Sequence, residues 1–359
     1  MDESKIPNFN HLKIHSQYSI CEGAIKIDDL KEFSKTNKIR SLGLSDTTNM
    51  CGALEFAEKI SKVGTQPIIG SQINFKFEDT IGLLPLFALN EEGYKRLIKL
   101  SSYSFLNNDA LSEPHLEFDE LLKDSYGMAV FSGTVFGLFG QLFERAKFNE
   151  IENLYKKIKS VFGDRFYLEI QRHNDHNELS FEKFNLKESL QLEIPIIATN
   201  EVFYINNDMH EAHDALVCIG NKSYVNDKNR VKYTDQHYFK TNLEMSELFV
   251  DLPEALENNY NFPFRCNFRP LFSSPILPNI SSEKGGNADD ILKKDSLDGL
   301  KTKFNKVFGL KNNDLDTDKI FLEYKDRLDH ELSIIIEMKY ASYFLIVSDY
   351  IKWAKNNDI

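Results

Sequence analysis

Five polar side chains of this 359-residue chain each follow a predicted strand, at or near the point where the strand ends. They are His15, Asp46, Gln72, His173 and Glu201. Because the carboxyl ends of parallel strands meet on one side of a sheet or barrel, we expect these side chains to converge. Imidazole and carboxylate groups can bind Zn²⁺, Mn²⁺ or iron and activate water for phosphate-ester hydrolysis. Each residue taken alone could instead satisfy backbone groups of its own loop, so a structural role is the alternative.

The elements that position these residues are short apolar runs that alternate with helical patterns. This alternation is typical of β/α units around a parallel sheet or barrel, so the sequence predicts an α/β fold. The predicted strands are residues 11–14, 41–44, 67–69, 83–89, 128–131, 166–170 and 195–198. The predicted helices between them are residues 28–36, 50–62, 91–104, 139–147, 150–161 and 181–192.

The pattern changes after about residue 200. A helix at 208–218, a polar stretch at 220–236 and a short helix near Ser246 indicate an appended subdomain. Proline, serine and glycine residues then cluster, which favours a linker. We predict a first domain at 1–275 with its barrel core at about 8–205, a linker at 276–288, and a mainly helical segment at 289–359.

Composition excludes several classes of protein. The 43 Lys and Arg residues against 55 Asp and Glu residues give a formal charge of −12, so any contact with DNA must be local. Its apolar runs are far shorter than the roughly 20 residues of a membrane-spanning helix. No secretory signal precedes the first strand, and the four cysteines form no close pair, so we expect a cytoplasmic protein with reduced thiols and no membrane partner.

Specific motifs resemble a known family. Residues 11–19 (HLKIHSQYS), 43–49 (GLSDTTN) and 67–70 (PIIG) resemble the opening of the PHP (polymerase and histidinol phosphatase) domain of bacterial replicative DNA polymerase III alpha subunits. The likeness continues through residues 167–173, 196–202, 212–220 and 252–258. Residues 327–332 and 343–351 resemble the start of the polymerase catalytic core, so the likeness covers nearly the whole chain.

The resemblance implies a fold and a function. The fold would be a distorted TIM-like (β/α)7 PHP barrel followed by a mainly helical segment. The parent polypeptide would carry out template-directed DNA synthesis, with Mg²⁺ held by carboxylates that lie beyond residue 359, so no catalytic residue is expected in this segment. The implied partners are a proofreading exonuclease subunit docked on the PHP domain, other DNA polymerase III holoenzyme subunits, and DNA bound through downstream domains.

Several positions depart from the family's metal-ligand pattern, which has His-x-His at the first strand, Asp-His after the second, Glu in the third unit and a late Asp-x-His. Where the family has three histidines and a glutamate, this sequence has Lys13, Thr47, Gln72 and Phe203. The positions that keep an imidazole or a carboxylate are His15, Asp46, His173 and Glu201.

A lysine ammonium repels a divalent ion and could pair with Asp46 or with Glu201. We therefore predict a vestigial site and no cofactor in this segment, with Zn²⁺ or Mn²⁺ present only if the four retained residues still bind an ion. One alternative is a working metal-dependent phosphoesterase or 3′–5′ exonuclease. Another is a non-catalytic binding module for other replication proteins.

Overall fold

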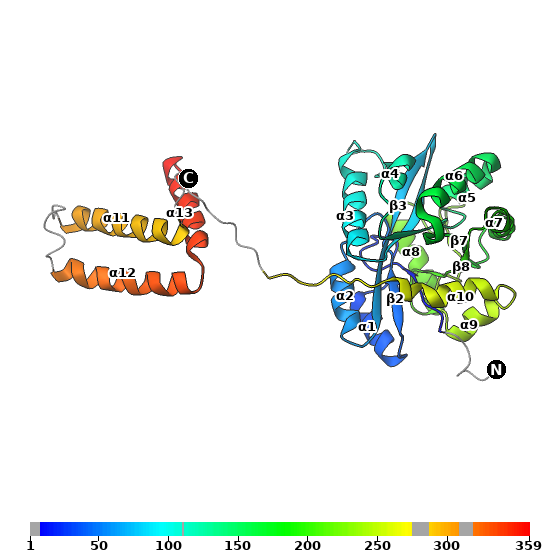
Figure 1. Ribbon diagram of the computed structural model, residues 1–359, viewed down its shortest axis with the longest axis horizontal. Coiled ribbons are helices and arrows are strands. Elements are labelled where there is room, and N and C mark those ends of the chain that lie inside the picture. The colour runs from blue at the N-terminus through cyan, green and yellow to red at the C-terminus, as the bar shows by residue number, and fades with distance from the viewer. Residues whose placement is uncertain (1–7, 110, 275–286, 309–318) are drawn as a thin grey trace. The chain divides into compact units, whose positions relative to one another are not determined.

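The computed structural model describes residues 8–109, 111–274, 287–308 and 319–359. The chain divides into two compact units, Met1–Phe272 and Ser273–Ile359, and each is described by itself. Most of their helices and some of their strands are labelled in Figure 1. Residues 276–286 of the linker that we expected at 276–288 lie outside the described residues.

Nine strands of the first unit form one sheet in the part of the chain that the structure describes. The strands are β1 (Lys13–Ile14), β2 (Ser41–Leu44), β3 (Gln66–Phe77), β4 (Thr80–Ala88), β5 (Leu116–Glu117), β6 (Met128–Phe131), β7 (Phe166–Ile170), β8 (Ile196–Ala198) and β9 (Glu201–Val202). Their order is β8-β7-β6-β4-β3-β2-β1-β9, and β5 pairs with β3.

Strand β4 departs from the expected parallel arrangement. The strand predicted at 83–89 exists, but it runs antiparallel to both of its neighbours, β3 and β6. The reason is a tight connection: Phe77 pairs with Thr80, so Glu78 and Asp79 alone turn the chain, and Glu78 has a positive φ of 54°. A two-residue loop can join antiparallel strands only, because a parallel pair needs a long crossover.

The sheet is strongly curled. Strands β8 and β9 lie at its two ends, yet Thr199 and Asn200 are the only residues between them in the chain. Its two edges are therefore held close together, which gathers the carboxyl ends of β1, β2, β7 and β8. The expected α/β class is confirmed as this curled sheet with helices on its outside (Figure 1).

The helices of the first unit follow the predicted alternation. They are α1 (Ile27–Thr36), α2 (Ala53–Ser61), α3 (Glu91–Leu106), α4 (Phe118–Lys123), α5 (Leu138–Glu144), α6 (Phe148–Phe162), α7 (Glu178–Leu192), α8 (His210–Gly220), α9 (Asn242–Leu248) and α10 (Pro253–Asn261). Helix α2 buries Ala53, Phe56, Ala57 and Ile60, the face that its apolar spacing predicts. The sequence did not predict α4, α10, β5 or β9.

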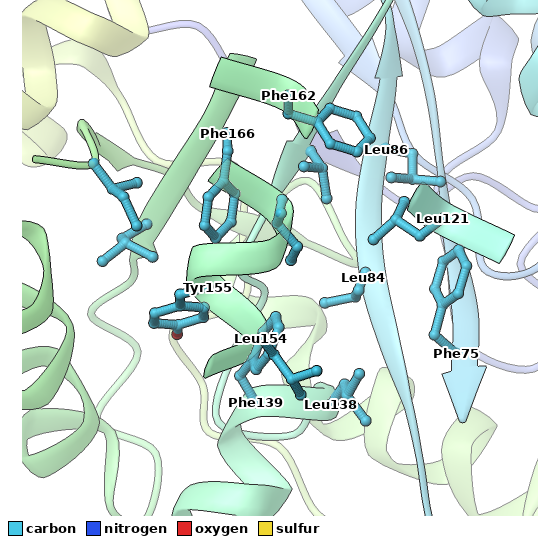
Figure 2. Close-up of a cluster of buried hydrophobic side chains, with 14 of the residues drawn as sticks. Phe75, Leu84, Leu86, Leu121, Leu138, Phe139, Leu154, Tyr155, Phe162 and Phe166 are labelled. Atoms are coloured by element: carbon cyan, nitrogen blue, oxygen red, sulfur yellow. The ribbon is translucent and has the colours of Figure 1, made fainter. Parts of the chain in front are cut away.

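Both faces of the sheet are buried. On the outer face, Leu84 and Phe166 pack with Phe139 and Tyr155 of the covering helices α5 and α6 (Figure 2). Residues that alternate with these along the strands, such as Phe131 and Phe87, form a second cluster on the opposite face. Alternation between two apolar clusters explains why these strands read as continuous hydrophobic runs.

The second unit is helical, as expected for residues 289–359. Its helices are α11 (Ala288–Phe308), α12 (Lys319–Glu337) and α13 (Ala341–Asn356). Leu292, Leu332 and Leu345 form its main buried cluster, while Tyr350 and Trp353 of α13 are largely exposed. Across the described residues, no helix is long and apolar enough to cross a membrane.

The outer cluster of the sheet gives a stability prediction. Leu84→Ala should lower the free energy of unfolding by about 2–5 kcal/mol, because Leu84 is completely buried and the surrounding rings cannot fill the cavity. Urea unfolding followed by circular dichroism measures the change. Leu190→Ala is the matched control, since Leu190 is 84% exposed and its loss should cost less than about 0.5 kcal/mol. Equal effects of the two substitutions would contradict this packing.

Candidate functional site

A buried lysine lies where the strands bring the predicted site together. Lys13 of β1 is completely buried, and its Nζ lies 3.3 Å from Oε1 of Glu169 and 3.3 Å from Oε2 of Glu201. The Glu201 contact follows from the sheet register, because Lys13 and Glu201 are paired between β1 and β9. One ammonium group thus connects three strands, β1, β7 and β9.

The two carboxylates respond differently to this ammonium. Burial alone would raise the pKa of Glu201, but the Lys13 charge and a hydrogen bond with His15 hold that pKa well below its usual value. Burial raises the pKa of Glu169, and the Lys13 ammonium offsets this only in part. Glu201 is therefore the anion that balances Lys13, while Glu169 accepts a proton more readily.

His15 contacts the same carboxylate. Its Nε2 lies 2.9 Å from Oε1 of Glu201, and the Gln72 amide donates to that oxygen at 2.6 Å. The other ring nitrogen, Nδ1, is 3.3 Å from the hydroxyls of both Ser19 and Thr47. Burial disfavours the charged imidazole, yet the hydrogen bond to Glu201 and the negative charges of Glu22, Glu201 and Asp46 together outweigh it and raise the pKa of His15. Both ring nitrogens of His15 are engaged by protein groups.

Asp46 is joined to His15 through the Ser19 hydroxyl, which contacts both side chains. Its Oδ1 accepts from the backbone N–H of Ser16 at 2.7 Å and from the Ser19 hydroxyl at 2.8 Å, and its Oδ2 accepts from the Ser16 hydroxyl at 2.8 Å. Of the two partners that the sequence offered for Lys13, the ammonium contacts Glu201, and Glu169 takes the second place. Asp46 instead holds the loop that follows β1.

His173 contacts the backbone of Glu201 rather than its carboxylate. Its Nε2 lies 3.0 Å from Oδ1 of Asn200 and 3.2 Å from the backbone nitrogen of Glu201. Its ring stacks on that of His237, with centroids 4.1 Å apart and planes 3° from parallel. Burial holds the pKa of His173 well below its usual value, so this imidazole is neutral. The structure thus brings His15 and Glu201 into direct contact and places His173 next to them.

The residues at the family's ligand positions do not fit a divalent metal. Nζ of Lys13 occupies the space between the acidic oxygens, where it neutralises them as an ion would. Phe203 fills the position of the late histidine, with its ring centroid 4.6 Å from that of His15. Space counts against a substrate rather than against the ion itself, since the hollow beside Glu201 and Phe203 measures about 30 Å³ and ordinary ligand pockets begin at roughly 300 Å³.

Sequence reasoning missed three site residues: Glu169, Asp175 and His237. A signal existed for Glu169, because it is the one charged residue in the otherwise apolar run FYLEI of β7. Asp175 and His237 come together through the fold, with Oδ2 of Asp175 3.2 Å from Nε2 of His237. No local pattern joins these two residues, which belong to loops far apart in the chain.

Comparison with known proteins identifies the class of domain that this fold and site represent. Residues 11–173 match the family model described as PHP domain, and residues 290–359 match that of the bacterial DNA polymerase III alpha NTPase domain. A region similar to the PHP domain is thus followed by a region similar to a second polymerase III alpha domain.

Curated relatives that match nearly the whole chain identify the protein family. The DNA polymerase III alpha subunits of Rickettsia conorii and Caulobacter vibrioides are 37% and 35% identical to this chain over 98% and 100% of its length. The chain is homologous to the N-terminal region of the bacterial DNA polymerase III alpha subunit, which confirms the resemblance seen in the sequence. It spans 30% and 31% of the length of these two relatives.

The solved structures are more distant. An amidohydrolase from Chromobacterium violaceum is similar at a TM-score of 0.36 and 12% identity, over 54% of this chain and 87% of that chain. A likeness at this level supports no conclusion about chemistry.

Replacing Lys13 tests the charge balance of the site. Lys13→Met should lower the free energy of unfolding by about 3–5 kcal/mol near neutral pH, because two buried carboxylates then face each other without a cation. Without Lys13, the interaction that lowers the pKa of Glu169 and of Glu201 is lost, so both groups resist ionisation in the folded variant. The deficit relative to the wild type should be largest at about pH 8 and shrink towards about pH 5.

Urea unfolding at several pH values measures this deficit. Lys62→Met is the matched control, since Lys62 pairs with Glu58 on an exposed helix surface, and it should leave stability nearly unchanged. The combined change of Glu169 and Glu201 to Gln should remove most of the cost of Lys13→Met. A deficit that is independent of pH would argue against the proposed charge balance.

Proposed function

We propose that this chain is the N-terminal part of a replicative DNA polymerase alpha subunit. The whole polypeptide would carry out template-directed DNA synthesis from deoxynucleoside triphosphates, with Mg²⁺ in a polymerase site beyond residue 359, and would work in the cytoplasm. Homology over 98% of this chain to alpha subunits supports this proposal. This segment by itself would not synthesise DNA.

The PHP domain in this proposal is a scaffold, and the family's ligand positions around Lys13 hold no metal. The observation that carries it is the Lys13 ammonium, which lies 3.3 Å from a carboxylate oxygen on each of β7 and β9. A metal-dependent hydrolase needs an exchangeable site at which a metal can bind water and substrate. A covalently attached cation offers neither, so His15, Asp46, His173 and Glu201 serve to hold strands and loops together.

A PHP domain without a hydrolytic centre would leave proofreading to a separate subunit. A polymerase without its own proofreading activity needs a separate exonuclease, and we propose that such a subunit docks on this PHP domain. Other holoenzyme subunits would also be partners, and DNA would be bound through domains downstream of this segment. The net charge of −12 agrees with a surface that binds proteins rather than DNA.

The second candidate function is a metal-dependent phosphoesterase or 3′–5′ exonuclease. The contact between His15 and Glu201 favours it, since imidazole and carboxylate are metal ligands. Against it stand the buried Lys13 and the side chains of Gln72 and Phe203, which fill the positions of family ligands.

A cleavage assay separates these two functions. The whole chain, incubated with a 3′-labelled DNA strand and Mn²⁺, Zn²⁺ or Mg²⁺, should release no label above the protein-free background. Release of label that is abolished in His15→Ala and in Glu201→Gln would establish the phosphoesterase in place of the scaffold. Release that persists in both variants would indicate a contaminating nuclease, and the scaffold proposal would then stand.

The coding sequence tests the polymerase assignment independently. We expect the reading frame to continue past codon 359 into a Gly/Ser-rich loop and paired aspartates, because two-metal phosphoryl transfer requires such carboxylates. A stop codon directly after residue 359 would contradict the polymerase assignment and leave the binding and phosphoesterase functions.

A further inference from the structure

Two histidines and an aspartate meet beside the Lys13 centre without taking part in it. His173 follows β7, Asp175 lies on the exposed loop after it, and His237 comes from the segment between α8 and α9. Each offers one ligand atom, and the three atoms lie within 4.8 Å of one another. Of this trio, His173 alone belongs to the set that the family resemblance singled out.

The two imidazoles have unused binding capacity. Nδ1 of His173 and Nδ1 of His237 are both buried and, among the residues that the structure describes, neither has a hydrogen-bond partner. An orphaned nitrogen in a buried ring loses its hydration without compensation. Nδ1 of His173, which lies 3.4 Å from Oε1 of Glu178, is thus available to a ligand, whereas His237 meets Asp175 through Nε2 and not through its orphaned Nδ1.

The spacing of the trio suits a metal ion. Oδ2 of Asp175 lies 3.2 Å from Nε2 of His237. Bond lengths of about 2.0–2.2 Å to zinc place two ligands of a tetrahedral site roughly 3.3 Å apart, so an ion could replace the proton between these two atoms. One ring nitrogen of His173 lies within 4.8 Å of the other two ligand atoms. Rotation of the His173 ring would bring this nitrogen to the same ion.

The charges around the trio favour a cation. Asp175 is one carboxylate, and Oε1 of Glu178 lies 3.4 Å from Nδ1 of His173. The opposing charge is Lys240, whose ammonium donates to Oδ1 of Asn200 at 3.2 Å. Burial raises the pKa of Glu178 to about 7, so near neutral pH this group carries only part of a negative charge, and the carboxylate of Asp175 is the one that contacts His237 directly.

We propose that His173, Asp175 and His237 form a binding site for one Zn²⁺ ion, separate from the centre that Lys13 occupies. Two imidazoles and one carboxylate are a ligand set that zinc accepts, with water in the fourth position. The ion would connect the loop after β7 to the segment before α9. This site does not depend on the proposed scaffold function, because it uses neither Lys13 nor the pair of His15 and Glu201.

Zinc titration of the whole chain, with a chromophoric chelator as competitor, tests the site. We expect one Zn²⁺ per chain, and Co²⁺ in its place should give the visible absorption of a tetrahedral site. Asp175→Asn and His237→Gln should each weaken binding by about tenfold or more. Glu201→Gln should leave the affinity unchanged, as should the control His115→Gln, since His115 contacts the carbonyl of Glu113 outside the trio.

The variants also define the results that would overturn the site. No binding by the wild-type chain would do so, and so would binding that is lost in Glu201→Gln while Asp175→Asn retains it. Circular dichroism of each variant verifies the fold; if His237→Gln unfolds, Asp175→Asn carries the test, because its side chain keeps its size. Cleavage of DNA plays no part in this readout, so failure of the zinc site and failure of the scaffold proposal are separate results.

Discussion

The burial of one ammonium group between two carboxylates is the interaction on which the centre of this barrel depends. Removing Lys13, Glu169 and Glu201 from water costs several kcal/mol for each charge, and their mutual attraction offsets this only with good geometry and further hydrogen bonds. The structure supplies these bonds through His15 and Gln72, which both contact Glu201. The positions of β1, β7 and β9 are thus tied to one balance of charge.

In the proposed scaffold, this balance would keep the PHP fold together without a bound metal. A metal ion and a lysine both neutralise inward-facing carboxylates, so either can hold the same strands. They differ in what they leave free: a metal keeps coordination positions for water and substrate, whereas an ammonium uses its protons in fixed hydrogen bonds. Phe203 adds to this effect, since its ring packs on His15 where an imidazole would offer a lone pair.

The sequence predicts the helices and strands better than it predicts the contacts between their side chains. The strands at 41–44, 128–131 and 166–170 match β2, β6 and β7 residue for residue, because short apolar runs between turn signals are local features. The direction of β4 was missed, since a strand buried on both faces reads the same in either direction. His15 and Glu201 were found through strand ends and family likeness, but the partnership of Lys13 with Glu169 and that of Asp175 with His237 arise from the closed fold.

The pairing of β1 with β9 also affects the order in which contacts form while the protein is being translated. Lys13 and Glu201 are 188 residues apart in the chain. While the ribosome is still making the intervening helices, β1 can pair with β2, but its ammonium has no carboxylate to meet and remains hydrated. Contacts between segments so far apart in the chain form late, because closing the long loop between them costs conformational entropy. The edge of β1 that pairs with β9 therefore remains unpaired until Glu201 has left the exit tunnel.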